Sequence, residues 1–216
     1  MAQPPGSPTA DLPAPGKPRL CLAMIPAGCV FRPKPRELID CYLIPQALHG
    51  RVPDNLIQDG VAHGVDVHAA RPEALPFPSC NRDRDGDHPV WGYFFTTRPE
   101  DAAGSGKYVR EVAAGGRWCW CGGHDKGYAG YGAGEVYAFR TRFAYYEDDG
   151  KMTQWRMKEY RLNEGAACFR GVAFRPGAAN LVVWKVYYEL RIDEVKRPME
   201  YNSSDEKSRT KRIKTG

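Results

Sequence analysis

The sequence has no long hydrophobic run. Its longest apolar stretch, residues 20–31, has 12 residues and contains Pro26, whereas a membrane-spanning helix needs about 20 apolar residues in succession. The segment before this stretch is rich in proline and poor in charge, unlike the positively charged start of a secretory signal peptide. We therefore expect an intracellular protein that does not interact with a membrane.

The sequence lacks an even set of cysteines. Seven cysteines in 216 residues do not fit a fully paired disulfide framework, so we expect the thiols to be mostly reduced. A strong excess of one charge is also missing, since the net charge is only +5. The segment 202–216, with five basic and two acidic residues, contributes +3 of it, which leaves +2 for the rest of the chain. Composition alone therefore does not identify a nucleic-acid-binding protein, and the positions of the charges must decide.

Proline and polar residues set off the two ends of the chain from a central unit. Residues 1–18 contain six prolines and almost nothing that a core could bury, so they cannot offset the entropy lost on ordering. The last residues are polar and basic. We predict a disordered leader at 1–18, one folded domain at 19–197, and a disordered basic tail at 198–216. The central unit is long enough for a single hydrophobic core.

One helix is predicted near the start of the folded domain, at 35–43. Pro35 suits the first helical turn, and Glu37 lies where the helix dipole favours an acid. The apolar residues at 38, 39, 42 and 43 share one face of this helix. We expect Gly50 to end it, and a second, weaker helical pattern covers residues 54–59.

Beyond Val90 the pattern changes to strands. Apolar and polar residues alternate in 135–147, which places Arg140 and Arg142 on one face of a strand. The opposite face carries Tyr137, Phe139, Phe143 and Tyr145. Further strands are predicted at 91–97, 154–162, 168–174 and 181–192. A helix followed by a series of antiparallel strands predicts the α+β fold class.

Two short motifs resemble metal sites but lack part of the pattern. Residues 81–86 (NRDRDG) imitate the opening of a calcium-binding loop, but position twelve is Gly92 rather than a glutamate. Cys119, Cys121 and His124 could serve a zinc- or thiol-dependent enzyme, but zinc needs a second pair of ligands that the sequence does not offer. We expect an acidic turn and ordinary strand residues, with no metal, no cofactor and no catalytic site.

The basic segment 107–142 is more informative. Arg140 and Arg142 share the polar face of one strand, so their charges add on one surface, where they could meet phosphates. A solvated outer face is the alternative interpretation. In the tail, Lys211, Arg212 and Lys214 fit a nuclear import signal or a loose phosphate contact.

Ordered sequence blocks resemble the NAC-domain family of plant transcription factors. Residues 28–38 (GCVFRPKPREL), with CYL at 41–43, are similar to the family's opening GFRFxPTDEEL and its tyrosine-leucine helix. The next blocks, 66–76 (DVHAARPEALP), 91–95 (WGYFF) and 116–126 (GRWCWCGGHDK), are similar to the family's DVY…PxxLP, WYFF and GYWKATGxDK. Residues 155–162 (WRMKEYRL) nearly keep the family's WxMxEYRL. The likeness extends over residues 27–189.

The resemblance implies a twisted antiparallel β-sheet flanked by a few short helices. It also implies a nuclear DNA-binding regulator of transcription that is not an enzyme and needs no cofactor. In the family one strand enters the major groove of double-stranded DNA at sites with a CGT core, and nearby basic residues hold the backbone. Carried over to this chain, Arg117, Trp118 and Lys126 lie near the bases. The implied backbone contacts are Arg98, Lys107, Arg110, Arg140 and Arg142.

Two positions depart from the family pattern. Cys119 occupies the place of the groove-entering lysine, and a thiol is a weak donor without a fixed charge. Val30 occupies the place of the arginine that pairs with a glutamate in family dimers. Glu37 matches that glutamate, and Arg32 could replace the arginine in a homodimer or a heterodimer with a relative. The alternative function is therefore a NAC-like interaction module that has lost base readout and acts by dimerising with intact relatives.

Overall fold

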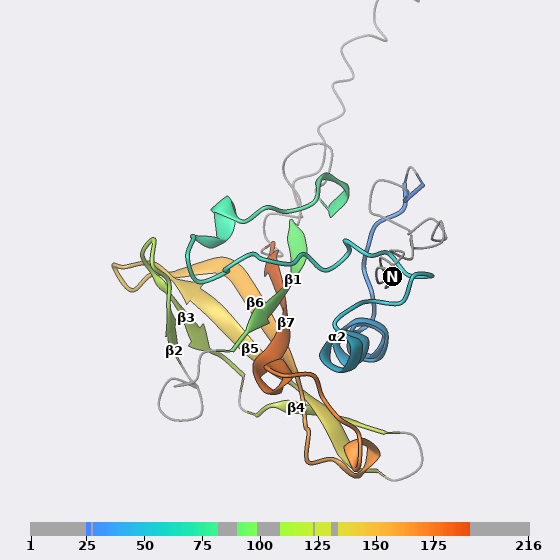
Figure 1. The fold of residues 1–216 in the computed structure, drawn as a ribbon. Coiled ribbons are helices and arrows are strands. Elements are labelled where there is room, and N and C mark those ends of the chain that lie inside the picture. The colour runs from blue at the N-terminus through green and yellow to red at the C-terminus, as the bar shows by residue number, and fades with distance from the viewer. Residues whose placement is uncertain are drawn as a thin grey trace, which may run out of the picture.

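In the computed structural model the described residues form a twisted antiparallel sheet of seven strands (Figure 1). The structure describes residues 25–26, 28–81, 90–98, 109–122, 124–130 and 134–190. The strand order is β1-β7-β6-β5-β3-β2, and β4 pairs with β5 next to β3. The strands are β1 (Trp91–Thr97), β2 (Val109–Glu111), β3 (Arg117–Trp120), β4 (Lys126–Ala129), β5 (Val136–Tyr146), β6 (Met152–Leu162) and β7 (Leu181–Tyr188). This confirms the predicted α+β class.

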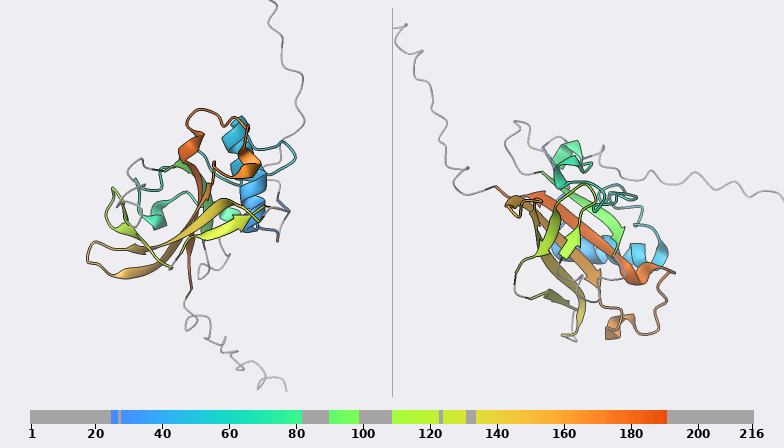
Figure 2. Two further views of the ribbon diagram at one scale, coloured as in Figure 1. Left: turned by 90° about the horizontal axis from the view of Figure 1, so that it is seen from below. Right: turned by 90° about the vertical axis from the view of Figure 1, so that its left-hand side faces the viewer.

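One helical segment precedes the sheet and packs against one of its faces (Figure 2). It consists of α1 (Pro35–Glu37), a π-helical turn η2 (Leu38–Leu43) and α2 (Ile44–His49). Pro45 has no N–H to donate, and the wider hydrogen-bonding pattern of η2 comes just before it. Gly50, with φ of 68°, ends the segment in the left-handed conformation. The predicted helix and its end are confirmed, and its apolar face is buried.

Each face of the sheet has its own apolar cluster. On the helix side, Tyr160, Val183 and Phe95 lie in one cross-strand row and pack against the helical segment. On the other side, Phe94 and Trp184 lie in a row with Glu159 and pack with residues 65–77. The alternation in β7 therefore divides its side chains between two cores, as period-two patterning requires.

Three expectations about local structure are wrong. Residues 168–174 form no strand; a 3₁₀ turn, η7 (Ala167–Phe169), buries Phe169 on the helix-side cluster and is followed by a loop. Residues 54–59 form turns rather than a helix. Tyr137 does not join Phe143 and Tyr145, because its hydroxyl donates to Asp40 of the helical segment at 2.7 Å. Other single turns are η3 (Pro72–Ala74), η4 (Ser79–Asn81) and η8 (Ala178–Asn180).

No helix in the described part of the chain is long and apolar enough to cross a membrane. Several expectations fall outside the described residues. They are the leader 1–18, the tail 198–216 with Lys211, Arg212 and Lys214, Lys107, and most of the acidic segment 81–86.

Candidate nucleic-acid interface

The polar face of β5 meets basic residues of its neighbours. Arg140 is directly opposite Lys126 of β4, and Arg142 lies two residues further along the same face. Lys126 and Arg142 are exposed, whereas Arg140 is half-buried beside Tyr128. No carboxylate among the described residues forms an ion pair with any of the three. We call this group, Lys126, Arg140 and Arg142, the basic corner.

Strand β3 continues this face at its edge. Cys119 is opposite Ala144 of β5, and the backbone N–H of Cys121 donates to the carbonyl of Arg142 at 2.9 Å. Alternation along β3 therefore puts Arg117, Cys119 and Cys121 on the side of the basic corner. Arg117 is half-buried and reaches this surface from the start of the strand.

Trp118 faces the opposite side and is fully buried. Its ring lies 5.1 Å from that of Tyr145, within the cluster that holds Trp184. The resemblance placed Trp118 near the bases, but in this fold it is a core residue that a DNA base cannot reach. Burial on one face of a strand is incompatible with readout from the other.

Arg110 also lies inside the molecule rather than on a DNA-facing surface. Its guanidinium donates to Glu159 at 2.8 Å, and the two side chains are only 3% and 1% exposed. The guanidinium carbon of Arg110 lies 5.1 Å from the ring centroid of Phe143. Arg98 approaches the same carboxylate at 3.9 Å and is 21% exposed. The Glu159 carboxylate therefore draws both arginines inward, and Arg110 is unavailable to a phosphate.

The same buried region contains His68. Burial, with Arg110 close by, lowers the pKa of this imidazole to about 4. The centroids of the His68 and Trp184 rings are 4.2 Å apart, with the two rings perpendicular. The histidine is therefore neutral in the folded protein near pH 7. It belongs to the core and not to the basic corner.

The end of the sheet near the start of β3 is acidic. Glu147, Asp148 and Asp149 form the turn between β5 and β6. Asp148 accepts a 2.6 Å hydrogen bond from the backbone of Gly116 and pairs with Arg71 at 3.3 Å. The sheet therefore carries positive charge at the basic corner and negative charge beside Arg117.

Cys119 of β3 and Cys121, directly after this strand, were the candidates for a thiol- or zinc-dependent centre. Burial raises the pKa of Cys121, although Arg156 and Arg142 act against this rise, so burial disfavours the thiolate that a nucleophile or metal ligand needs. His124 is exposed, and no group of three metal-ligating side chains occurs among the residues that the structure describes.

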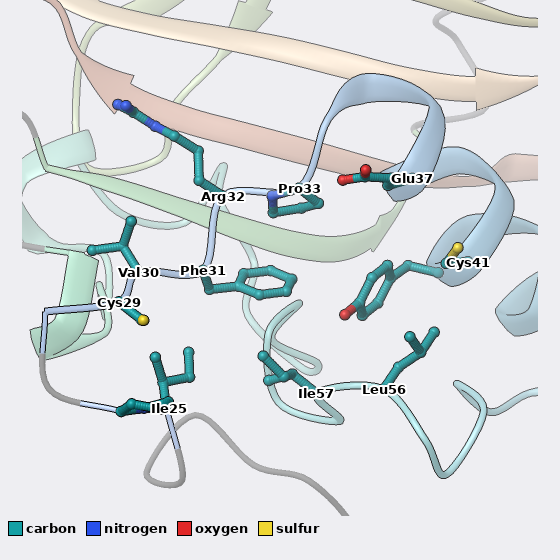
Figure 3. A pocket seen from close by; sticks show the side chains of 12 residues that line it. Ile25, Cys29, Val30, Phe31, Arg32, Pro33, Glu37, Cys41, Leu56 and Ile57 are labelled. Atoms are coloured by element: carbon teal, nitrogen blue, oxygen red, sulfur yellow. The ribbon is translucent and has the colours of Figure 1, made fainter.

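The two residues of the expected dimer contact line one groove. This groove of about 580 Å³ lies between the segment before α1 and the loop after α2. Its lining is mostly apolar, as Figure 3 shows for Ile25, Leu56 and Ile57. Arg32 points away from these apolar groups toward the sheet, with its guanidinium carbon 4.6 Å from the Trp91 ring centroid. Glu37 accepts a 2.8 Å hydrogen bond from the backbone of Lys34.

Sequence reasoning missed three cations on the helix-side face of the sheet. They are Arg156 and Lys158 on β6 and Lys185 on β7. A signal was present, because alternation in 154–162 puts Arg156 and Lys158 on one face of their strand, and alternation in 181–188 puts Lys185 on the face of its strand opposite to Val182, Trp184 and Val186. The strand register is what brings them together, and this cannot be read from either strand alone.

Comparison with known families agrees with this architecture. A sequence model of the No apical meristem (NAM) protein family matches residues 26–162, more than half of the chain. The matched region includes the helical segment and strands β1 to β6. A comparison with curated proteins finds no match. The extent of the family match, together with the twisted antiparallel sheet, shows that the chain belongs to the NAM, or NAC-domain, family of plant transcription regulators, which are not enzymes.

Proposed function

We propose that the protein regulates transcription in the nucleus by binding double-stranded DNA, with β3 placed at the major groove. The basic corner carries this proposal. Lys126, Arg140 and Arg142 present three positive charges on neighbouring strands, and no described carboxylate neutralises them in an ion pair. Such a cluster attracts DNA by releasing the counterions that surround its phosphates.

The structure narrows the set of residues that we propose for DNA contact. Arg117 is the candidate for the bases, because it lies on the side of the basic corner at the start of β3. Lys126, Arg140 and Arg142 are the candidates for the backbone, where contacts set affinity and register. Trp118 and Arg110 are left out because they are buried, and Arg98 because it is turned toward Glu159. Lys107 stays a sequence-based prediction.

A dimer is part of the proposal, with a second copy or a relative seated on the apolar groove. Val30 is 48% exposed at this groove, although it is a large apolar residue, and an exposed apolar patch is typical of an interaction surface. Arg32 rests on Trp91 and faces the sheet. We therefore infer that apolar contacts, together with Glu37, form the dimer contact.

A second candidate function is an interaction module without base readout. Two observations favour it. The side of β3 that we place at the major groove carries the thiol of Cys119, with that of Cys121 directly after the strand, and the turn beside Arg117 is acidic. Thiols are poor hydrogen-bond donors to base edges. Such a protein would act by pairing with an intact relative.

The test is a titration of the purified chain with a duplex that contains a CGT core and with a scrambled duplex, over a range of salt. We expect tighter binding to the duplex with the CGT core. In Arg140→Ala/Arg142→Ala the fall of log affinity with log salt should become less steep by about 2. The control Arg51→Ala/Arg175→Ala removes two exposed arginines near the end of α2 and should leave the slope nearly unchanged. Equally feeble binding to both duplexes would reject DNA readout and favour the interaction module.

A further inference from the structure

Three cationic side chains lie next to one another across the middle of the sheet. Arg142 of β5 is directly opposite Lys158 of β6, which is directly opposite Lys185 of β7. Residues opposite each other in antiparallel strands share a face, with Cβ atoms about 5 Å apart. Because these strands are adjacent (Figure 1), the positive charges are continuous. We call Arg142, Lys158 and Lys185 the cation row.

A fourth cation reaches the row from the segment before α1. Arg32 lies over the ring of Trp91 on β1 and points toward the sheet (Figure 3). On the same strand, Tyr93 is directly opposite Lys185. Arg32 is close enough to Lys185 to act on its ionisation. The positive surface therefore extends from β5 to the edge strand β1.

Tyrosine rings hold the two lysines on the sheet. The ammonium of Lys158 lies 4.7 Å from the ring centroid of Tyr187, and that of Lys185 lies 5.4 Å from Tyr93 and 5.5 Å from Tyr187. Attraction between a cation and an aromatic face favours this placement, and both lysines are half-buried. Side chains that are already held in place lose less entropy when they bind a ligand.

The row has no internal counter-charge in the part of the chain that the structure describes. No carboxylate there forms an ion pair with any of its members. Glu189 is the acid that acts on Lys158, but it is itself paired with Arg156 at 3.0 Å. Three neighbouring cations are thus left to an external anion.

The ionisation of the lysines shows the cost of this arrangement. Burial lowers the pKa of Lys158, and the positive charges of Arg140 and Arg142 lower it further. Burial also lowers the pKa of Lys185, to about 8, with contributions from Lys158 and Arg32. A bound anion would reverse these shifts, because it favours the charged form of a lysine.

We propose that the cation row, together with Arg32, binds phosphate groups of the nucleic-acid backbone. The identity of the ligand rests on the proposed function, whereas the anion site rests on the geometry of the row alone. The charges are spread over three strands, which suits a chain of successive phosphates better than a single carboxylate. Lysine and arginine are also the side chains that neutralise DNA phosphates in complexes. The DNA would then extend from the basic corner along the cation row on the helix-side face.

The first test compares the wild-type chain with Lys158→Gln/Lys185→Gln on the core and scrambled duplexes. We expect affinity to fall about tenfold or more on both duplexes, and the salt slope to fall by about 2. The ratio between the two duplexes should not change, because phosphate contacts carry no sequence information. Arg51→Gln/Arg175→Gln is the control with the same loss of charge. An unchanged slope in the lysine variant, with wild-type binding intact, would overturn the proposal.

Folding of the lysine variant is checked by its unfolding midpoint in urea. Since both lysines are held with lowered pKa values, their replacement by neutral residues should keep or raise that midpoint. A loss of DNA binding without a loss of stability therefore supports a direct contact. A loss of DNA binding together with a loss of stability would overturn the inference that the positive charges of the two lysines destabilise the folded protein.

The second test uses pH and the variant Lys185→Arg. The ionisable groups facing Lys185 are Lys158 on β6, Arg32, Tyr93 on β1 and Tyr187 on β7, and burial raises the pKa of both tyrosines above its usual value. Between pH 7 and pH 9 Lys185 loses its proton, so wild-type affinity for the duplex should fall. Arginine stays charged, and the variant should keep its affinity. The same decline in both proteins would overturn a contact by Lys185.

Inorganic phosphate separates the two possible sources of the anion. At pH 8 its binding to the row should be accompanied by proton uptake by the wild-type chain and by none in Lys185→Arg. Uptake without any duplex binding would show a site for free phosphate and would overturn the DNA backbone as the ligand. The wild type could bind both duplexes equally while the affinity of the lysine variant depends less steeply on salt. This result would reject base readout and support the phosphate site.

Discussion

The Arg110–Glu159 ion pair joins the short strand β2 to the long strand β6. Both side chains are almost fully buried, and the arginine passes over the rings of Phe143 and Trp184. Taking two charges out of water is expensive, and the pair is tolerated only because the partners satisfy each other. Removing the carboxylate therefore takes from the buried guanidinium of Arg110 the acidic oxygen that lies 2.8 Å away.

We predict that Glu159→Gln lowers the free energy of unfolding by about 3 kcal/mol or more. The neutral amide removes the charge of Glu159 from the side of the buried Arg110 guanidinium, whereas Arg98 is 21% exposed and so nearer to water. Urea unfolding followed by tryptophan fluorescence measures the change.

The matched control for this prediction is the double variant Arg110→Met/Glu159→Leu. Replacing both charges by apolar groups of similar volume should restore much of the lost stability. A Glu159→Gln protein within about 1 kcal/mol of the wild type would contradict the prediction and show that water reaches the pair.

At the scale of elements, the acidic turn between β5 and β6 would oppose the proposed DNA contact at its end of the sheet. Glu147 and Asp149 add negative charge beside the start of β3, while Asp148 is needed to hold the backbone of Gly116. Gly116 itself has φ of 74° and packs against the Tyr145 hydroxyl, so this turn is tightly constrained. Asp149 accepts a 2.8 Å hydrogen bond from the backbone of Lys151, and the amide oxygen of an asparagine can accept the same bond, so charge can be removed at Glu147 and Asp149 while the turn is kept.

We predict that Glu147→Gln/Asp149→Asn raises affinity for a duplex several-fold at low salt. The expected cause is loss of repulsion between the turn and the phosphates near Arg117. Because salt screens such interactions, with a Debye length of about 10 Å at 0.1 M and 3 Å at 1 M, the gain should disappear at high salt. Fluorescence anisotropy at two salt concentrations checks this.

The control removes two acids elsewhere, in Asp59→Asn/Glu164→Gln. Glu164 lies in the turn after β6, at the opposite end of that strand from residue 147. An equal gain in both double variants would indicate a general effect of net charge and would exclude the turn as a neighbour of the DNA.

The sequence allowed prediction of elements where one periodicity dominates. Alternation in β5 predicted that Arg140 and Arg142 share a face, and the apolar spacing at 38, 39, 42 and 43 predicted the buried side of the helical segment. Residues 168–174 have the pattern of a strand, but within them only Phe169 is buried, and it packs on the core from a 3₁₀ turn. Short apolar patterns do not distinguish these cases.

The candidate site was only partly predictable, because it depends on contacts between distant strands. Arg110 is a basic residue in a basic segment, and nothing near it in the sequence shows that Glu159 draws it into the core. Lys158 and Lys185 become neighbours only through the register of β6 and β7. Local patterns specify which face a residue takes, whereas register decides which residues meet.

At the scale of the whole molecule, the groove and the cation row are two different surfaces, one for each of the two proposed partners. The groove is mostly apolar and lies beside the helical segment, and the row is basic and lies on the sheet. Arg32 borders both surfaces, since it is one of the residues that line the groove and its guanidinium is directed to the sheet. A dimer formed through the groove would therefore leave the basic residues of both copies free for DNA.

We predict that Val30→Asp weakens self-association by about tenfold or more, because it would bury an unpaired carboxylate in an apolar contact. Sedimentation equilibrium over a range of concentrations measures this. The variant should also bind a duplex with two CGT half-sites more weakly than the wild type does, yet bind a single half-site equally well, since only simultaneous engagement is lost. Val172→Asp, at another exposed valine far along the chain, should match the wild type in both measurements. A wild-type chain that stays monomeric at every concentration, or a Val30→Asp variant that associates as the wild type does, would place any dimer contact elsewhere on the molecule.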